Sequence, residues 1–307
     1  MRLASQTHLG CGLATPKRAG QWRAGAILAG LGLVLVGAAC GDNGAQPPPS
    51  AAPTVVERPD DVAVPDRART VATTLARVET TLRTDGPTAR ELAVLGWEQQ
   101  NAYRALAAHP DWLPEVVAGL PDLAAIVTAN HDAGTGLSGL AEPQPELPDW
   151  RIEAPPPLDV LVGYYREAEA ASGIPWPYLA AIHLVETRLG RIRGTSTAGA
   201  QGPMQFIPET WVRYGEGDIN DNRDAILAAG RYLAAAGGPE DMDRALYAYN
   251  NSERYVAAVQ GYAGLIQADE RAFRGYYQWQ VYYATVDGVA LLPEGYPGRE
   301  AVITRRS

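Results

Sequence analysis

The sequence predicts an all-α fold class: a mainly helical protein with an N-terminal helical region and a small C-terminal β-hairpin. Apolar residues recur at three- and four-residue spacing in several stretches, as on one face of a helix. Prolines and glycines stand at the ends of these stretches, where helices start and stop. Near the C-terminus, bulky and small residues alternate about Asp287-Gly288, which is a hairpin signal. The 307 residues are enough for one or two domains with a real core.

The first 40 residues are predicted to be an export signal. A basic leader without acidic residues is followed by an apolar run over 24–39, which ends in small residues before Cys40. Small residues directly ahead of a cysteine resemble a bacterial lipobox, although Gly37 stands where leucine is usual. We therefore expect a lipid on Cys40 and a location on the outer face of the bacterial cell membrane. An uncleaved membrane anchor and plain secretion are the alternatives.

Composition argues against several classes of function. The two cysteines, Cys11 and Cys40, both lie in the first 40 residues, so the rest of the chain has no disulfide and no cysteine zinc site. The acidic loop over 216–224 superficially resembles a calcium loop but has Asp221 where glycine is required, and no metal or other cofactor is expected. With 26 basic and 35 acidic residues, nucleic acid is not expected as a partner.

Beyond the leader, composition divides the chain into five parts. Residues 41–60 are rich in proline, alanine and glycine and should form a flexible tether. A helical accessory region is expected over 61–142, either as a layer packed on the following domain or as a module that binds a partner or the cell wall. A proline-rich linker over 143–157 leads to the main domain, 158–298, and 299–307 form a tail whose end should fray.

Several helices can be placed individually from their apolar spacing and end signals. Asp221 or Asn222 should cap one of them, and Ser252 should cap another. The expected helices run through Val71–Leu82 and Leu92–Leu106, near 112–120 and 121–130, over 158–171, from Pro175 through Leu189, from Pro208, over 223–236 and from Pro239 to Asn250.

The helix that starts at Pro175 carries the most informative residue, Glu186. Leu179, Ile182, Val185 and Leu189 form an apolar stripe typical of an amphipathic helix. Glu186 lies at the edge of this stripe and should be partly desolvated. Desolvation raises the pKa of a carboxyl group, so Glu186 could hold a proton near neutral pH and deliver it to a leaving group. The alternative is an ordinary surface glutamate.

A loop with four glycines follows over 190–206 and should let the backbone approach a ligand closely. Gln201 and Gln205 carry amides that suit hydroxyl-rich or acetamido-bearing ligands, while Met204 and Phe206 supply an apolar wall. For each glutamine, simple solvation at the surface is the alternative.

These residues together resemble a known family. Glu186-Thr187, the run from Gly199 to Phe206 with its Gly-Pro-Met-Gln turn, and Tyr249-Asn250 occur in the order seen in the lytic transglycosylase family with the goose-lysozyme-like fold. Within that family they are nearest to the branch with the membrane-bound type B enzymes. The chain departs from the family at Asn251-Ser252-Glu253, where a glycine is common. The resemblance covers about 157–298.

The resemblance implies a substrate, peptidoglycan glycan strands, and a set of site residues. Glu186 would be the single catalytic acid and base, and Thr187, Gln201, Met204, Gln205, Tyr249 and Asn250 would bind substrate. It implies that Glu186 protonates the glycosidic oxygen between N-acetylmuramic acid and N-acetylglucosamine. The acetamido group would then stabilise the charge, and Glu186 would activate the C6 hydroxyl to give a 1,6-anhydro end.

Two other functions remain open on the sequence. A muramidase would cleave the same bond with water and needs a second carboxylate, but Glu169 and Glu209, the nearest acids, lie outside the motifs. A non-catalytic lipoprotein that binds the cell wall would keep the fold without turnover. His183 could touch the Glu186 carboxylate, although a packed or solvated histidine is the favoured interpretation. Peptidoglycan and, through Cys40, the membrane are the expected partners, and the sequence indicates no protein partner.

Overall fold

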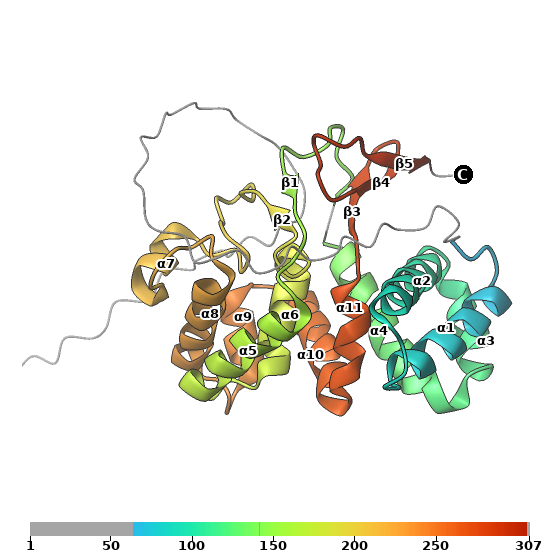
Figure 1. Ribbon diagram of the computed structural model, residues 1–307, viewed down its shortest axis with the longest axis horizontal. Coiled ribbons are helices and arrows are strands. Elements are labelled where there is room, and N and C mark those ends of the chain that lie inside the picture. Colours follow the sequence, from blue (N-terminus) through green and yellow to red (C-terminus); the bar gives the residue numbers. More distant parts are fainter. Residues whose placement is uncertain (1–63, 141, 306–307) are drawn as a thin grey trace, which may run out of the picture.

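The computed structural model describes residues 64–140 and 142–305, and helices dominate it (Figure 1). The predicted leader, the lipid site at Cys40 and the tether over 41–60 lie outside the described residues. The helices are α1 Ala68–Leu82, α2 Ala89–Ala108, α3 Leu113–Ala118, α4 Ala124–Ser138, α5 Leu158–Ser172, α6 Trp176–Thr187, α7 Pro208–Tyr214, α8 Asn222–Ala236, α9 Met242–Tyr249, α10 Glu253–Ala268 and α11 Phe273–Tyr277. The mainly helical prediction is confirmed.

Side-chain caps define the starts of α2, α8, α9 and α10. Asp221 caps α8 and Ser252 caps α10, each with a side-chain oxygen that accepts a backbone N–H, as predicted. Helix α9 begins at Met242 and not at Pro239, because Asp241 caps it there. Helix α4 is longer than the spacing predicted and continues to Ser138.

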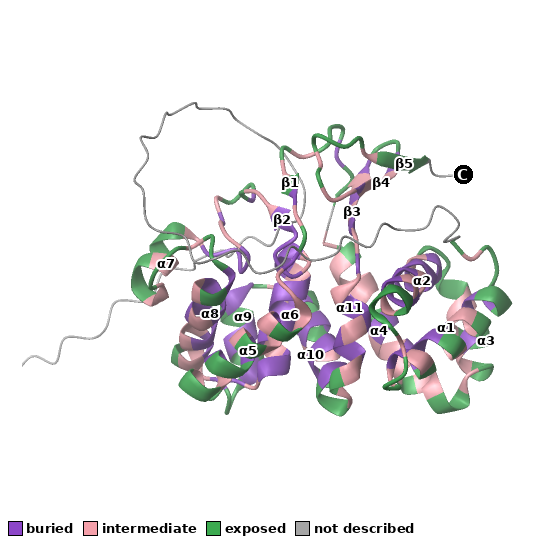
Figure 2. Ribbon diagram, viewed as in Figure 1, coloured by how far each residue is buried: buried purple, intermediate pink, exposed green. Residues whose placement is uncertain are grey.

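Helices α1 to α4 form a layer that packs on the second half of the chain. Helix α4 lies against α10, and α2 lies against α11. Buried apolar residues of both halves belong to one continuous cluster, and Figure 2 shows buried segments in the helices on both sides of this contact. Helices α1 to α4 and the Glu186 helix therefore share one hydrophobic core.

A buried polar network fixes this layer to the end of α11. Glu79 is fully buried, and its Oε1 accepts hydrogen bonds from Gln99 Nε2 at 3.0 Å and Tyr103 Oη at 2.6 Å. Its other oxygen is paired with Arg83. Gln99 Oε1 in turn accepts a hydrogen bond from Trp279 Nε1 at 3.0 Å. Because every member has partners, the network orients the layer without leaving a buried charge unpaired.

The predicted C-terminal hairpin is present and is extended by a third strand. Strands β3 Val281–Thr285, β4 Gly288–Leu292 and β5 Val302–Arg305 form an antiparallel sheet in that order. The hairpin closes at the pair Thr285 and Gly288, so the turn residues are Val286-Asp287, one position earlier than predicted. The expectation that the last residues, 303–307, fray is wrong for Ile303, Thr304 and Arg305, whose backbone pairs with β4.

The linker over 143–157 joins this sheet to the loop after the Glu186 helix. Its strand β1, Arg151–Ile152, pairs with β2, Ile192–Arg193. Ile152 and Ile192 pack with buried residues of β3 and β4 in a small second core. The linker and the C-terminal sheet thus hold strand β2, at the start of the glycine-rich loop, in place.

Among the described residues, no single helix combines the length and apolar composition needed to cross a membrane. The two segments 110–118 and 121–138 meet those requirements only when taken together, and the chain bends by 117° between them.

Candidate active site

Helix α6 holds Glu186 at the centre of the second half. Pro175 is its N-cap and Pro177 lies in its first turn, as the sequence predicted. The helix is buried on nearly all sides and not only along one stripe, because α5, α8 and α10 all pack against it. The amphipathic interpretation therefore understated its burial, and Glu186 lies inside the fold and not at its edge.

The Glu186 carboxyl group is almost completely shielded from solvent. Its side chain is 4% exposed, and its Oε1 accepts a hydrogen bond from the Tyr255 hydroxyl at 2.8 Å. Burial raises the pKa of Glu186 to about 8, and the hydrogen bond from Tyr255 opposes this rise without cancelling it. At neutral pH Glu186 is thus mainly protonated and has the charge state of a general acid.

Two tyrosines connect Glu186 to the Gly-Pro-Met-Gln turn. The Tyr249 hydroxyl donates a hydrogen bond to the Met204 carbonyl oxygen at 2.6 Å. The Tyr249 ring lies parallel to that of Tyr255, with ring centroids 6.5 Å apart. The pKa of Tyr249 is raised well above its usual value, first by burial and then by the nearby Glu186 carboxylate. The structure thus brings Glu186, Tyr249 and the turn together.

Thr187 joins the end of α6 to the same turn. Its hydroxyl donates to the Pro203 carbonyl oxygen at 2.6 Å and accepts from the Gly190 backbone N–H at 3.0 Å. The side chain is fully buried. Thr187 thus connects the end of α6 to the turn through hydrogen bonds. Its side chain has no exposed surface with which to make the predicted contact with substrate.

Most side chains of the turn are buried, which does not fit the roles predicted for them at a ligand surface. Met204 is fully buried and Phe206 is 3% exposed, so their side chains belong to the core and do not form the predicted open wall. Gln205 Nε2 donates to the Gly202 carbonyl oxygen at 2.8 Å, while its buried Oε1 has no partner. The backbone of Gln201 pairs with that of Phe206, and its side chain is half-buried. The Met204 carbonyl oxygen accepts the hydrogen bond from Tyr249, and the predicted binding roles of Gln201, Met204 and Gln205 stay predictions.

Asn250 lies next to Tyr249 but has a different environment. It is the C-cap residue of α9, and its backbone N–H donates to the Leu246 carbonyl oxygen at 2.9 Å. Its side chain is 7% exposed. Its position beside Tyr249 matches the motif, and its binding role stays a prediction.

Comparisons with known proteins agree with this arrangement. Residues 163–270 match the family described as the transglycosylase SLT domain. This match supports the assignment of residues 163–270 to that family. The range contains Glu186, the turn, Tyr249 and Tyr255.

One curated relative is similar to part of this chain. The chain is 34% identical over 110 residues to the membrane-bound lytic murein transglycosylase F of Thiobacillus denitrificans. The alignment covers 33% of this chain and 23% of the relative, so the chain spans about a quarter of the length of the relative. No solved structure matches the chain. The narrower resemblance to the type B branch stays a prediction.

Close backbone packing shapes the turn of the SLT domain. Gly202 has φ 73°, and a Cβ atom there would lie 1.8 Å from the Ile219 carbonyl oxygen. Such a distance is far inside van der Waals contact, so only glycine fits. The turn therefore packs directly against the segment before α8, and this contact fixes the position of the turn next to Tyr249.

His183 has the packed role that the sequence analysis favoured. It is fully buried, and its Nδ1 lies 2.8 Å from the Tyr165 hydroxyl. Burial, followed by the charge of Arg193, lowers the pKa of His183 to about 3. The ring is thus neutral at neutral pH and cannot act as a proton donor to substrate.

Tyr255 is the site residue that the sequence analysis missed. It lies in the first turn of α10, six residues after Tyr249. The chain has 15 tyrosines, and most tyrosines serve as packing residues, so composition could not single it out. The useful signal is positional: Ser252 fixes the start of α10 directly after the Tyr-Asn pair, which brings the next aromatic residue back toward α6.

A Tyr255→Phe variant should be less active by about tenfold, because the Glu186 carboxyl group loses the hydrogen bond that orients it. The same bond lowers the pKa of Glu186, so its removal should raise that pKa further. The alkaline limit of the pH–activity profile is thus expected to move to higher pH. Profiles of both proteins on the same peptidoglycan preparation measure the shift; a shift to lower pH would contradict the assigned contact.

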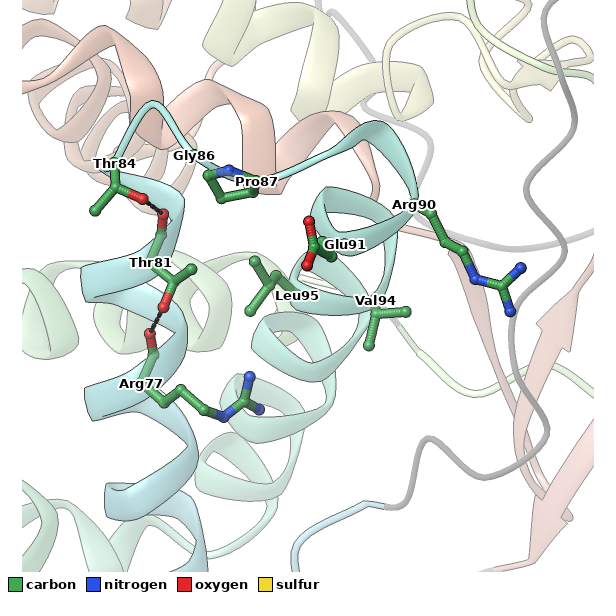
Figure 3. A pocket seen from close by; sticks show the side chains of 9 residues that line it. All are labelled: Arg77, Thr81, Thr84, Gly86, Pro87, Arg90, Glu91, Val94 and Leu95. Carbon is green, nitrogen blue, oxygen red and sulfur yellow. Dashed lines mark hydrogen bonds between the residues drawn. The ribbon is translucent and has the colours of Figure 1, made fainter.

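A cavity in the N-terminal layer lies apart from this site. It has a volume of about 560 Å³ and opens between α1 and α2 (Figure 3). Its one acidic lining residue, Glu91, accepts a hydrogen bond from the backbone N–H of Thr88 at 2.7 Å and serves to cap α2. With no acid–base pair, this cavity gives no indication of catalysis, and the chemistry is assigned to the Glu186 cluster.

Proposed function

We propose that this protein is a peptidoglycan lytic transglycosylase that cleaves the β-1,4 bond between N-acetylmuramic acid and N-acetylglucosamine without water. The observation that carries the proposal is the buried Glu186 carboxyl group, whose Oε1 accepts a hydrogen bond from Tyr255 and whose pKa is raised by burial. The match to the SLT domain and the name of the relative, a lytic murein transglycosylase, support the substrate class.

In the proposed mechanism Glu186 acts first as an acid and then as a base. It transfers its proton to the glycosidic oxygen while the bond to the muramyl C1 breaks. The acetamido group of the same sugar stabilises the positive charge that develops at C1. The Glu186 carboxylate then removes the proton of the C6 hydroxyl, whose oxygen bonds to C1 and forms the 1,6-anhydro ring. Glu186 is protonated again at the end, so no water is consumed.

The charge environment of Glu186 supports a single carboxylate. Among the described residues, burial and the Tyr255 hydrogen bond account for its pKa, and no second acid contributes. A hydrolytic glycosidase needs another carboxylate, either as a nucleophile or as the base that activates water. A reaction in which the substrate supplies both the stabilising acetamido group and the C6 hydroxyl nucleophile needs only one carboxylate from the protein.

The test is a digest of purified peptidoglycan followed by mass spectrometry. The proposal predicts muropeptides with 1,6-anhydro ends, which lack one water relative to reducing ends. Reducing ends would instead identify a muramidase. Intact glycan strands after digestion would favour a non-catalytic protein that binds the cell wall.

We also propose that Cys40 carries a lipid that holds the enzyme at the outer face of the cell membrane. The leader before Cys40 and the membrane-bound relative support this location. Cells grown with labelled palmitate should incorporate label into the wild-type protein and not into a Cys40→Ser variant. Equal labelling of both proteins would reject Cys40 as the lipid site.

A further inference from the structure

A second cavity lies in the N-terminal layer, where the start of α1 and the neighbouring α3 meet. It has a volume of about 420 Å³ and is lined by Arg67, Ala68, Arg69, Trp112 and Glu115. Both arginines and the glutamate are exposed, so the cavity is open to solvent. Its volume falls within the range of pockets that bind small molecules.

Trp112 supplies a flat apolar surface in this cavity. Its ring stacks on that of His109, with ring centroids 4.1 Å apart and planes 12° apart, and this contact fixes the orientation of the indole. Trp112 is only partly buried, whereas Trp97, Trp176 and Trp279 are buried. Its indole N–H has no hydrogen-bond partner in the part of the chain that the structure describes. The indole can therefore offer both an apolar face and a polar donor to a ligand.

Polar side chains without partners surround the indole. Neither the Arg69 guanidinium nor the Glu115 carboxylate has a hydrogen bond or an ion pair within the described residues. Arg67 is paired with its neighbour Asp66, with 3.2 Å between Nε and Oδ1. The cavity thus holds a free donor, Arg69, and a free acceptor, Glu115, beside one aromatic ring.

The larger cavity shown in Figure 3 lacks this combination. No aromatic residue is among those that line it, and its polar groups are largely occupied. Arg77 is paired with Glu98 at 2.7 Å, and Glu91 caps α2. A ligand there would compete with contacts that the protein already makes, so the cavity at Trp112 is the better candidate for a binding site.

The lining of the cavity at Trp112 matches the chemistry of a sugar. One face of a pyranose ring carries C–H groups that can pack on an aromatic ring, and its hydroxyl and acetamido groups both donate and accept hydrogen bonds. Arg69 can donate to these groups and Glu115 can accept from them. An anion such as phosphate would meet the Glu115 carboxylate in the same cavity, which favours an uncharged, hydroxyl-rich ligand.

We propose that this cavity is a second, non-catalytic binding site for glycan. Its ligand class, a β-1,4-linked chain of N-acetylated sugars, rests on the proposed function. Figure 1 shows α1 and α3 at the end of the molecule away from α6, so the cavity is separate from the Glu186 cluster. The polymeric wall, with its many strands, can occupy both sites at once, whereas a short fragment occupies one. A molecule held on the polymer through Trp112 has a higher effective concentration of glycan at Glu186.

Nitrogen-15 NMR of the tryptophan indole groups tests binding at this cavity. The protein carries Glu186→Gln to prevent turnover, and the probe is a soluble tetrasaccharide of β-1,4-linked N-acetylglucosamine. A Trp112→Phe variant assigns the Trp112 resonance, which should shift during the titration. Arg69→Gln should weaken the affinity read from this resonance by about 3- to 10-fold. A Trp112 resonance that stays in place up to the solubility limit of the tetrasaccharide would overturn the proposal.

Turnover of two substrates by the otherwise wild-type enzyme tests what the second site does. Trp112→Phe and Arg69→Gln should each slow the release of muropeptides from insoluble peptidoglycan by about tenfold. Both variants should cleave a soluble tetrasaccharide of alternating N-acetylglucosamine and N-acetylmuramic acid at the wild-type rate. The matched control is Arg90→Gln, which removes an exposed arginine of the larger cavity and should leave both rates unchanged.

The outcomes for the second site and for the proposed function differ. Equal loss on both substrates, or no loss on either, would overturn the second site and leave the enzyme assignment intact. Thermal unfolding checks that each variant is folded; if Trp112→Phe is not, Arg69→Gln still decides, because the Arg69 side chain is exposed and has no partner to lose. If the wild-type protein digests neither substrate while the Trp112 resonance shifts, the proposed function fails and the glycan site stands.

Discussion

A Glu186→Gln variant is expected to lose lytic activity by about 100- to 10,000-fold, the usual contribution of a general acid. The amide has nearly the same shape as the carboxyl group and can still accept the hydrogen bond from Tyr255. It can neither protonate the glycosidic oxygen nor remove a proton from the C6 hydroxyl group. Release of soluble muropeptides from peptidoglycan, quantified by mass spectrometry, measures the loss.

A second glutamate provides the matched control for this variant. Glu169 lies on α5, and its Oε1 accepts a hydrogen bond from the Trp176 backbone N–H at 3.3 Å. Glu169→Gln makes the same chemical change outside the Glu186 cluster and should keep near wild-type activity. If the two variants lose activity equally, Glu186 has no special role in the reaction.

The same Glu186→Gln change should stabilise the folded protein at alkaline pH. The pKa of Glu186 is about 8 in the folded state and near 4.5 when the chain is unfolded. A raised folded-state pKa contributes stability that is fully present below pH 4.5 and is lost as pH rises through 8. Above pH 8 the folded wild-type protein therefore carries a buried charge that the glutamine variant lacks. The expected gain at pH 9 is on the order of 5 kcal/mol in the free energy of unfolding, because the two pKa values differ by about 3.5 and each unit is about 1.4 kcal/mol.

Denaturant unfolding of both proteins at pH 4 and pH 9 measures this difference. The gain should be present at pH 9 and absent at pH 4, where Glu186 is protonated in both states. Since both proteins differ at one position only, other titrating groups cancel in the comparison. If the variant is less stable than the wild type at pH 9, the charged Glu186 carboxylate does not destabilise the folded protein, which would contradict the prediction.

The sequence predicted the position of Glu186 because local rules determine it. Pro175 and Pro177 define the helix start, and the spacing of Leu179 and Ile182 places Glu186 toward the apolar side. Caps such as Asp221 are similarly local, since the capping residue and the helix it starts are neighbours in sequence. These features could thus be predicted without knowledge of the tertiary fold.

The contacts around Glu186 could not be predicted, because they join segments far apart in the chain. Tyr255 reaches Glu186 across 69 residues, and Tyr249 reaches the Met204 carbonyl group across 45. A motif places Met204 near Glu186 but does not indicate that its side chain is buried and its carbonyl oxygen accepts the Tyr249 hydrogen bond. Strand β5 was missed for the same reason, since its apolar pattern becomes a strand only through pairing with β4.

Burial should keep Glu186 protonated at neutral pH, and the proposed reaction depends on this proton. A carbon-13 NMR titration of the glutamate carboxyl groups, with the Glu186→Gln variant used to assign the resonance, measures this directly. We predict that the Glu186 carboxyl group titrates with a pKa of about 8. A pKa near the ordinary value of 4.5 would contradict it, because the residue would then be a carboxylate at neutral pH with no proton to donate.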